Sequence, residues 1–104
     1  MKKSQLFFAL LNIVCNETEV DKDILLSRNR SAEVVDARHI FIKCLYDNGL
    51  YPNEIASRLG VSSRAVTHAL SSFHDRCSFG FYLRNNYEKI KKQLLDKEIT
   101  SADL

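Results

Sequence analysis

Residues 53–70 read NEIASRLGVSSRAVTHAL, and they predict two short helices joined by a tight turn. Apolar residues recur at helical spacing on both sides of Gly60. A glycine supplies the left-handed backbone conformation that such a turn needs, and we expect Val61 to plug the turn into the core. The residues expected to anchor the two helices are Ile55, Ala56, Leu59, Val66 and Leu70. The pattern predicts a helix-turn-helix over about residues 52–76.

The second helix of this pair has a polar outer side near its N-terminus. Ser62 is a good N-cap for it. The side chains expected to point outward are Ser63, Arg64, Thr67 and His68. In a DNA-binding helix-turn-helix, this end of the second helix meets base edges in the major groove. Arg64 is then the best candidate for a bidentate contact with guanine.

The remaining sequence predicts further helices and no strand. We therefore expect an all-α, compact bundle of about six helices that forms a single domain over residues 1–104. The expected helices run over about 3–16 and 21–26, from the Ser31 cap to Asn48, from Pro52 to Gly60, from the Ser62 cap to about 76, and over about 79–97. In the last helix, Phe81, Tyr82 and Tyr87 are expected to fold back on the domain.

The composition is that of an ordinary globular protein. The chain has 15 Lys and Arg against 13 Asp and Glu, a net charge of +2, so a DNA-binding face would need its positive charge concentrated in one place. Cys15, Cys44 and Cys77 are odd in number and widely spaced, which predicts free, buried thiols in a reducing, cytoplasmic compartment. The apolar run over 6–14 is too short to span a bilayer, so we expect a core helix and no membrane partner.

No pattern of residues points to catalysis or metal binding. The sequence has no glycine-rich phosphate-binding loop. His68 and His74 are six residues apart, which puts them about 120° apart around a helix and makes them a poor zinc-binding pair. We therefore expect no enzyme activity, no catalytic residue, no metal, no cofactor and no small-molecule substrate.

A basic element precedes the helix-turn-helix. Residues 27–31 read SRNRS, and Arg38 follows seven residues later. Taken alone, these residues fit a solvated loop better than a binding site. Beside a helix-turn-helix, the loop arginines Arg28 and Arg30 are suited to the minor groove, whose negative potential attracts cations, and Arg38 is suited to hold a phosphate.

Residues 24–40, which read ILLSRNRSAEVVDARHI, resemble part of the DNA-binding C-terminal domain of the bacterial replication initiator DnaA. That family has a short helix, a basic loop, a long helix that opens with a Val-x-x-x-Arg pattern, and then a helix-turn-helix. It also has a His-Ala pair like His68-Ala69. The resemblance covers roughly residues 12–73 and implies a Trp-repressor-like helix-turn-helix arrangement.

The resemblance also implies roles for single residues. It places Arg30 in the minor groove, Arg38 on a phosphate and His68 on the DNA backbone, with the Thr67 methyl beside a thymine methyl. The family's Gly-Gly-Arg-Asp-His-Thr-Thr opening of the recognition helix is replaced by GVSSRA at residues 60–65, so we expect a different target sequence. The family's ATPase module lies outside the resemblance, which leaves a partner ATPase or a homodimer open.

Two functions therefore fit the sequence. The first is sequence-specific binding of double-stranded DNA, in replication initiation or transcriptional regulation. The DNA-contacting residues expected for it are Arg28, Arg30, Arg38, Ser62, Ser63, Arg64, Thr67 and His68. The alternative is a protein-interaction or adaptor domain that retains the fold without binding DNA. The modest net charge favours this alternative, as do the acidic residues Asp36, Glu54 and Asp75 near the expected face.

Overall fold

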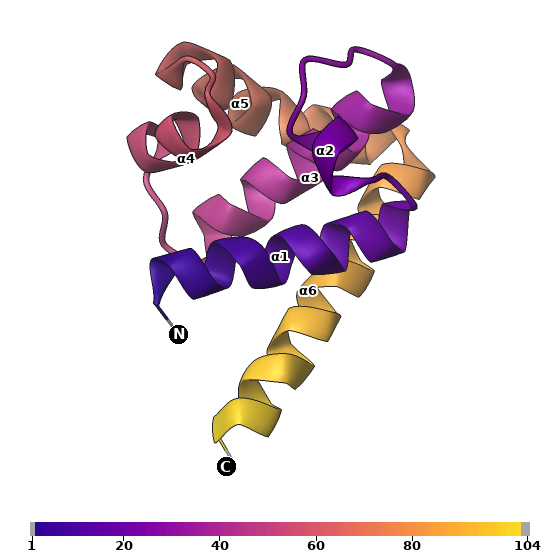
Figure 1. Ribbon diagram of the computed structural model, residues 1–104. Coiled ribbons are helices and arrows are strands. Elements are labelled where there is room, and N and C mark those ends of the chain that lie inside the picture. The colour runs from indigo at the N-terminus through magenta and orange to yellow at the C-terminus, as the bar shows by residue number, and fades with distance from the viewer. Residues whose placement is uncertain (1, 103–104) are drawn as a thin grey trace.

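Six α-helices make up almost all of the described chain, and residues 2–102 contain no strand (Figure 1). The computed structural model describes the backbone of residues 2–102 and the side chains of residues 2–76 and 80–96. The helices are α1 Lys3–Thr18, α2 Lys22–Leu25, α3 Ala32–Asp47, α4 Pro52–Leu59, α5 Ser63–Phe79 and α6 Phe81–Ala102. The prediction of an all-α bundle of about six helices is confirmed.

Local capping sets the ends of α4 and α5. Pro52 occupies the first turn of α4, where its missing N–H would have no helical partner. Glu54 Oε1 accepts the N–H of Tyr51 at 3.2 Å. Gly60 ends α4 with a φ of 69°, a conformation that favours glycine. Ser62 caps α5 by accepting the Ala65 N–H at 3.1 Å. The ends of α4 and the start of α5 are therefore set by Pro52, Gly60 and Ser62, the residues from which they were predicted.

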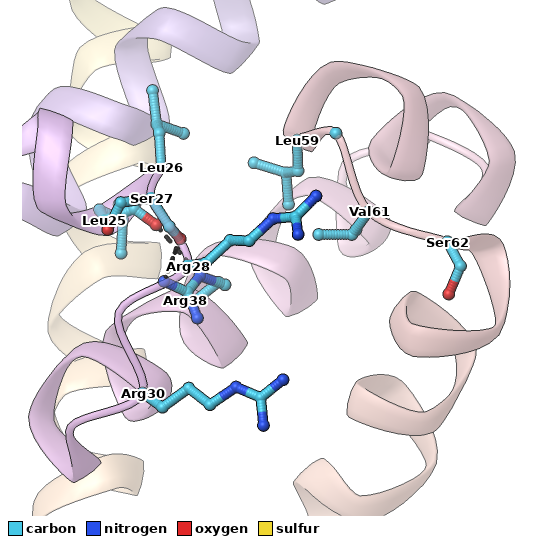
Figure 2. Close-up of a pocket in the computed structure, with 10 residues that line it drawn as sticks. Leu25, Leu26, Ser27, Arg28, Arg30, Arg38, Leu59, Val61 and Ser62 are labelled. Atoms are coloured by element: carbon cyan, nitrogen blue, oxygen red, sulfur yellow. Dashed lines mark hydrogen bonds between the residues drawn. The ribbon is translucent and has the colours of Figure 1, made fainter.

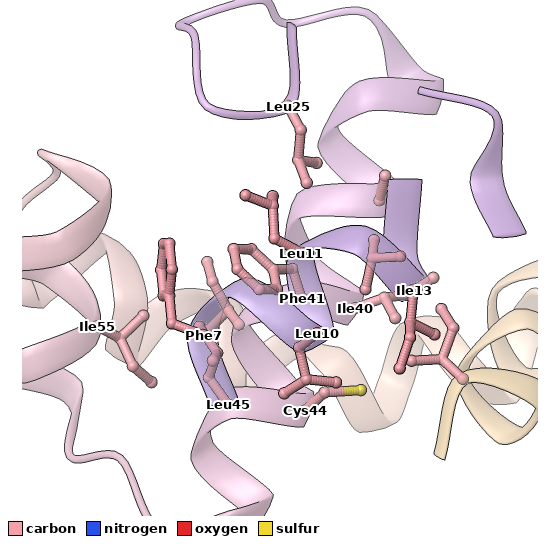
Figure 3. Packing of buried hydrophobic residues seen from close by; sticks show 14 of the residues in the cluster. Phe7, Leu10, Leu11, Ile13, Leu25, Ile40, Phe41, Cys44, Leu45 and Ile55 are labelled. Carbon is pink, nitrogen blue, oxygen red and sulfur yellow. The ribbon is translucent and has the colours of Figure 1, made fainter. Parts of the chain in front are cut away.

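The core is centred on α3, which contacts each of the other helices. Its side chains Ile40, Phe41 and Leu45 are fully buried. The rings of Phe7 and Phe41 lie 5.1 Å apart between α1 and α3 (Figure 3). Burying one such side chain contributes about 1.5–3 kcal/mol to the free energy of folding. Two further pairs of helices pack on each other, α1 on α6 and α4 on α5. Since α3 contacts all four of these helices, it joins the two pairs.

The junction between α5 and α6 differs from the prediction. The last helix begins at Phe81 rather than near residue 79, and Gly80 forms the break, where a Cβ would lie 3.0 Å from the Arg76 carbonyl oxygen. Phe81 and Tyr82 are 73% and 60% exposed, so the expectation that they fold back on the domain is wrong. The buried stripe of α6 instead comprises Leu83, Asn86, Ile90 and Leu94.

Tyr87 packs against the domain as expected. Its ring lies 5.0 Å from that of Phe73 in an edge-to-face arrangement, and its hydroxyl donates a hydrogen bond to the Asp47 carboxylate. Burial raises the pKa of the Tyr87 hydroxyl, and the bond to Asp47 raises it further. The hydroxyl therefore stays protonated and ties the start of α6 to the end of α3.

The described cysteines and the apolar N-terminal run belong to the core. Cys15 and Cys44 are buried free thiols, and burial raises the pKa of Cys44 to about 12, which disfavours the reactive thiolate. The side chain of Cys77 lies outside the described residues. The run over 6–14 supplies most of the buried side of α1. Across residues 2–102, no helix has both the length and the apolar character needed to cross a membrane.

Candidate nucleic-acid interface

An open cleft of about 360 Å³ lies between the loop joining α2 to α3 and the turn joining α4 to α5 (Figure 2). Its lining residues are Leu25, Leu26, Ser27, Arg28, Arg30, Arg38, Leu59, Gly60, Val61 and Ser62. Three of these residues are arginines and none is acidic. The structure thus brings the basic loop and the helix-turn-helix together at one cation-rich cleft, although they are separated in the sequence.

Arg38 holds the basic loop through the loop's own carbonyl groups. Its Nε donates to the carbonyl oxygen of Leu25 at 3.1 Å, and its Nη2 donates to those of Ser27 at 2.7 Å and Asn29 at 3.2 Å. The side chain is half-buried, and this burial lowers the pKa of the guanidinium, which nevertheless stays charged. Most of its donors are therefore used inside the protein. The expected phosphate contact stays a prediction, and it would have to use the remaining Nη1.

The loop is also ordered by its own polar side chains. Ser27 Oγ donates to the Ile24 carbonyl oxygen at 2.6 Å and accepts the Asn29 N–H at 3.2 Å. Asn29 Oδ1 in turn accepts the Ser31 N–H at 2.9 Å. Ser31 precedes α3 as predicted, but its side chain makes no capping bond. The backbone around the loop arginines is thus hydrogen-bonded at residues 24, 25, 27, 29 and 31 before any ligand binds.

Arg28 and Arg30 project from this ordered loop towards the helix-turn-helix (Figure 2). Both side chains are exposed, and neither forms an ion pair with any described acidic group. Unpaired guanidinium groups beside a cleft without acids create a local positive potential. The net charge of +2 does not show this local concentration of positive charge.

The outward residues of α5 lie beside the cleft rather than in its lining. Ser63, Arg64, Thr67 and His68 are all exposed, as predicted, while Val66 between them is fully buried. The Thr67 hydroxyl donates to the Ser63 carbonyl oxygen at 2.9 Å, so its polar atom is occupied within the helix. The Thr67 methyl is then the group most available to an apolar partner.

Val61 does not plug into the core as expected. It is 39% exposed and lines the cleft with Leu26 and Leu59. The backbone N–H of Val61 donates to the Ala56 carbonyl oxygen at 3.1 Å and so closes the C-terminal end of α4. The side chain that packs against the core at this end is that of Leu59, which is partly buried. The floor of the cleft is therefore partly apolar.

A charged cluster links α3 to α5. Arg76 of α5 donates to the Asp36 carboxylate and to Nδ1 of His39, both on α3. The two acceptors are three residues apart on one helical face, but their partner is 40 residues from Asp36. Sequence reasoning missed this cluster because no local signal marks such a distant partner. The cluster fixes α5 against α3, the same helix whose Arg38 holds the basic loop.

Two of the three acids expected to oppose a nucleic acid are neutralised within the protein. Asp36 pairs with Arg76, and the Glu54 carboxylate lies 2.8 Å from the Lys3 ammonium. The hydrogen bond from Lys3 lowers the pKa of Glu54. Asp75 is the exposed acid of the three. Of these three acids, only Asp75 has no ion pair within 4.0 Å among the described side chains.

The described side chains offer no metal-binding cluster, since no three His, Cys, Asp or Glu residues among them gather closely enough to hold an ion. No protein-family model matches the chain, and no curated protein matches it. The resemblance to DnaA thus rests on the sequence pattern over roughly residues 12–73 alone.

Acidification is expected to destabilise the protein through His39. Burial, and after it the charge of Arg76, lower the pKa of His39 from an ordinary value of 6.5 to about 4. Between these values the unfolded chain binds a proton that the folded chain does not, so stability is complete above pH 6.5 and falls towards pH 4. After allowing for solvent screening, the free energy of unfolding should fall by about 1 kcal/mol through this group between about pH 7 and pH 5.

Urea denaturation at the two pH values measures this effect. The variant His39→Gln keeps an acceptor for Arg76 but cannot titrate, so it should lose less stability on acidification than the wild type. If His39→Gln loses as much stability as the wild type, the proton is not taken up at this histidine.

Proposed function

We propose that the chain binds double-stranded DNA in a sequence-specific manner. The single observation that carries the proposal is the acid-free cleft, in which Arg28 and Arg30 face the turn of a capped helix-turn-helix. Phosphate contacts dominate the affinity of proteins for DNA and depend on concentrated positive charge. The exposed, hydrogen-bonding N-terminal end of α5 supplies the second requirement, a surface that can reach base edges.

The arrangement suits contacts in two adjacent grooves. With α5 in the major groove, Arg64 is the base-reading candidate, while Ser62 and the free N–H groups at the helix terminus face the phosphates. The basic loop then lies on the other side of the cleft, where Arg30 can follow the backbone into the minor groove. His68 and Arg28 would serve as further backbone contacts. Replication initiation and transcriptional regulation would use this same surface, and the resemblance to DnaA favours the former.

An adaptor function has one observation in its favour. Phe8, Tyr51, Phe81 and Tyr82 are all at least 60% exposed, and large exposed aromatic side chains are enriched in protein–protein interfaces. They are spread over α1, the start of α4 and the start of α6. None of them lines the cleft. The same chain can therefore bind DNA and a protein partner through different surfaces.

Selection from a random duplex library is expected to recover a defined DNA sequence. Three unpaired arginines, Arg28, Arg30 and Arg64, are available to neutralise phosphates or enter a groove. The plot of log affinity against log salt should then have a slope of about −2.7, at about −0.9 for each cation. No enrichment in the selection, or an affinity that does not change with salt, would overturn the proposal and favour the adaptor.

Replacing Arg64 by Ala should relax the sequence preference. A bidentate contact with guanine contributes roughly 1–3 kcal/mol of discrimination. The ratio between the affinity for the preferred duplex and that for a duplex with the guanine replaced should therefore be about tenfold smaller in Arg64→Ala than in the wild type. Arg58→Ala is the matched control, because Arg58 lies over the ring of Phe7 at 5.7 Å, outside the cleft lining. An unchanged preference in Arg64→Ala would assign base reading to another residue.

Arg38 is expected to act on DNA affinity through the loop that it holds. Arg38→Gln removes the donors to the loop carbonyls, so it should weaken binding about tenfold, or roughly 1.4 kcal/mol, when the loop arginines are present. In a background that carries Arg28→Ala and Arg30→Ala, the same change should have little effect. Competition binding on all four proteins measures the coupling.

A direct phosphate contact by Arg38 predicts a different result. The loss would then be equal in both backgrounds, and the salt slope would change by about 0.9 in each. Circular dichroism of each variant establishes that the helices are retained. Equal losses would therefore overturn the loop-holding role without affecting the proposal of DNA binding.

A further inference from the structure

A second pocket of about 310 Å³ lies on the flank of α5, against α3 and α6. It shares no lining residue with the cleft between the basic loop and the turn. Its apolar residues are Leu70, Phe73 and Tyr87. Small-molecule sites have volumes of roughly 300–1,000 Å³ and are mainly apolar, with a few polar groups that orient the ligand. The pocket is therefore large enough for a small ring system and no more.

The floor of this pocket is aromatic and rigid. Phe73 is buried, and its ring meets that of Tyr87 edge to face at a centroid distance of 5.0 Å. The Tyr87 hydroxyl is held by Asp47, so the ring cannot turn freely. Leu70 is partly buried and extends the floor along α5. A flat aromatic ligand could add to this ring pair in the offset or edge-to-face geometry that aromatic groups prefer.

The rim of the pocket carries an unneutralised guanidinium. Lys43 is 2.9 Å from the Asp47 carboxylate, so its charge is already compensated. Arg84 is exposed, and it forms no ion pair or hydrogen bond with the described side chains. Glu88, one turn further along α6, lies within 4.0 Å of Lys91. Arg84 thus has donors to spare on the rim, which also includes His74.

We propose that this pocket binds a small aromatic monocarboxylate. The guanidinium of Arg84 offers two parallel donors that match the geometry of a carboxylate, and the Leu70–Phe73–Tyr87 floor takes the ring. Glu88 on the same rim disfavours ligands with two or more negative charges. The inference concerns a surface away from the basic cleft and does not depend on DNA binding.

The affinity is expected to be modest because one side of the pocket is open. For a ligand of about a dozen heavy atoms, a dissociation constant on the order of 1 mM or somewhat tighter is reasonable. The probe is 2-naphthoate, titrated into the full chain at constant ionic strength and followed by amide chemical shifts. Shifts should be concentrated at Leu70, Phe73 and residues 84–88.

Two comparisons test the chemistry of recognition. The uncharged 2-naphthamide has the same ring and should bind at least fivefold more weakly, because it cannot accept the charge-assisted pair from Arg84. Arg84→Gln should weaken binding of 2-naphthoate about tenfold and leave that of 2-naphthamide unchanged. Arg58→Gln removes the same charge from α4, on another face of the molecule, and should behave like the wild type.

Three results would overturn the inference. The first is the absence of shifts up to about 10 mM ligand. The second is equal affinity for the two probes, which would mean an apolar depression without recognition of the carboxylate. The third is an equal loss of affinity in Arg84→Gln and Arg58→Gln, which would mean attraction by the overall charge alone.

Discussion

The burial of α3 among all the other helices is the constraint on which the rest of the structure depends. Ile40, Phe41 and Leu45 lie at its centre, and the Phe7–Phe41 contact fastens it to α1. Close packing makes such a helix a rigid reference, since small displacements would open voids or force side chains out of their rotamers. The polar side of α3 then carries Arg38 and the Asp36–His39 pair towards the two halves of the candidate interface. The width of the cleft is therefore set by one helix rather than by two independent loops.

The use of arginine at position 38 follows from the same geometry. A planar guanidinium has five donors in a fixed arrangement, and the carbonyl oxygens of Leu25, Ser27 and Asn29 lie within 3.2 Å of its nitrogens. A lysine ammonium is a point donor on a flexible chain and would not hold the loop at several places at once. A loop that is ordered in advance loses less conformational entropy when a ligand binds. The hydrogen bonds of Arg38 thus order the neighbouring loop arginines before a ligand binds.

Sequence reasoning succeeded where the signal was local. Gly60 with its positive φ and Ser62 with its bond to the Ala65 N–H mark the turn within a few residues, and the exposed set on α5 followed from the 3.6-residue period. It failed at Phe81 and Tyr82 because the break at Gly80 starts a new helix, which shifts the buried stripe to Leu83. The bonds of Arg38 could not be foreseen, since every residue has a carbonyl oxygen and nothing marks those that a side chain will reach. The pairs Asp36–Arg76 and Lys3–Glu54, 40 and 51 residues apart, likewise exist only after folding.

The net charge of +2 is a poor guide to the field at the cleft, because the acids are not spread evenly. The pairs Asp36–Arg76 and Lys3–Glu54 cancel within the protein, which leaves the loop arginines as local, uncompensated charge. Asp75 remains, seven residues beyond His68 along α5. At 1.5 Å per residue this is about 10 Å along the helix axis, close to the Debye length of roughly 8–10 Å at physiological ionic strength. Its repulsion at phosphates near Ser63–His68 is therefore largely screened. The loop arginines would act on a ligand in the cleft over contact distances, where screening is weak. The balance of charge at the cleft is therefore positive.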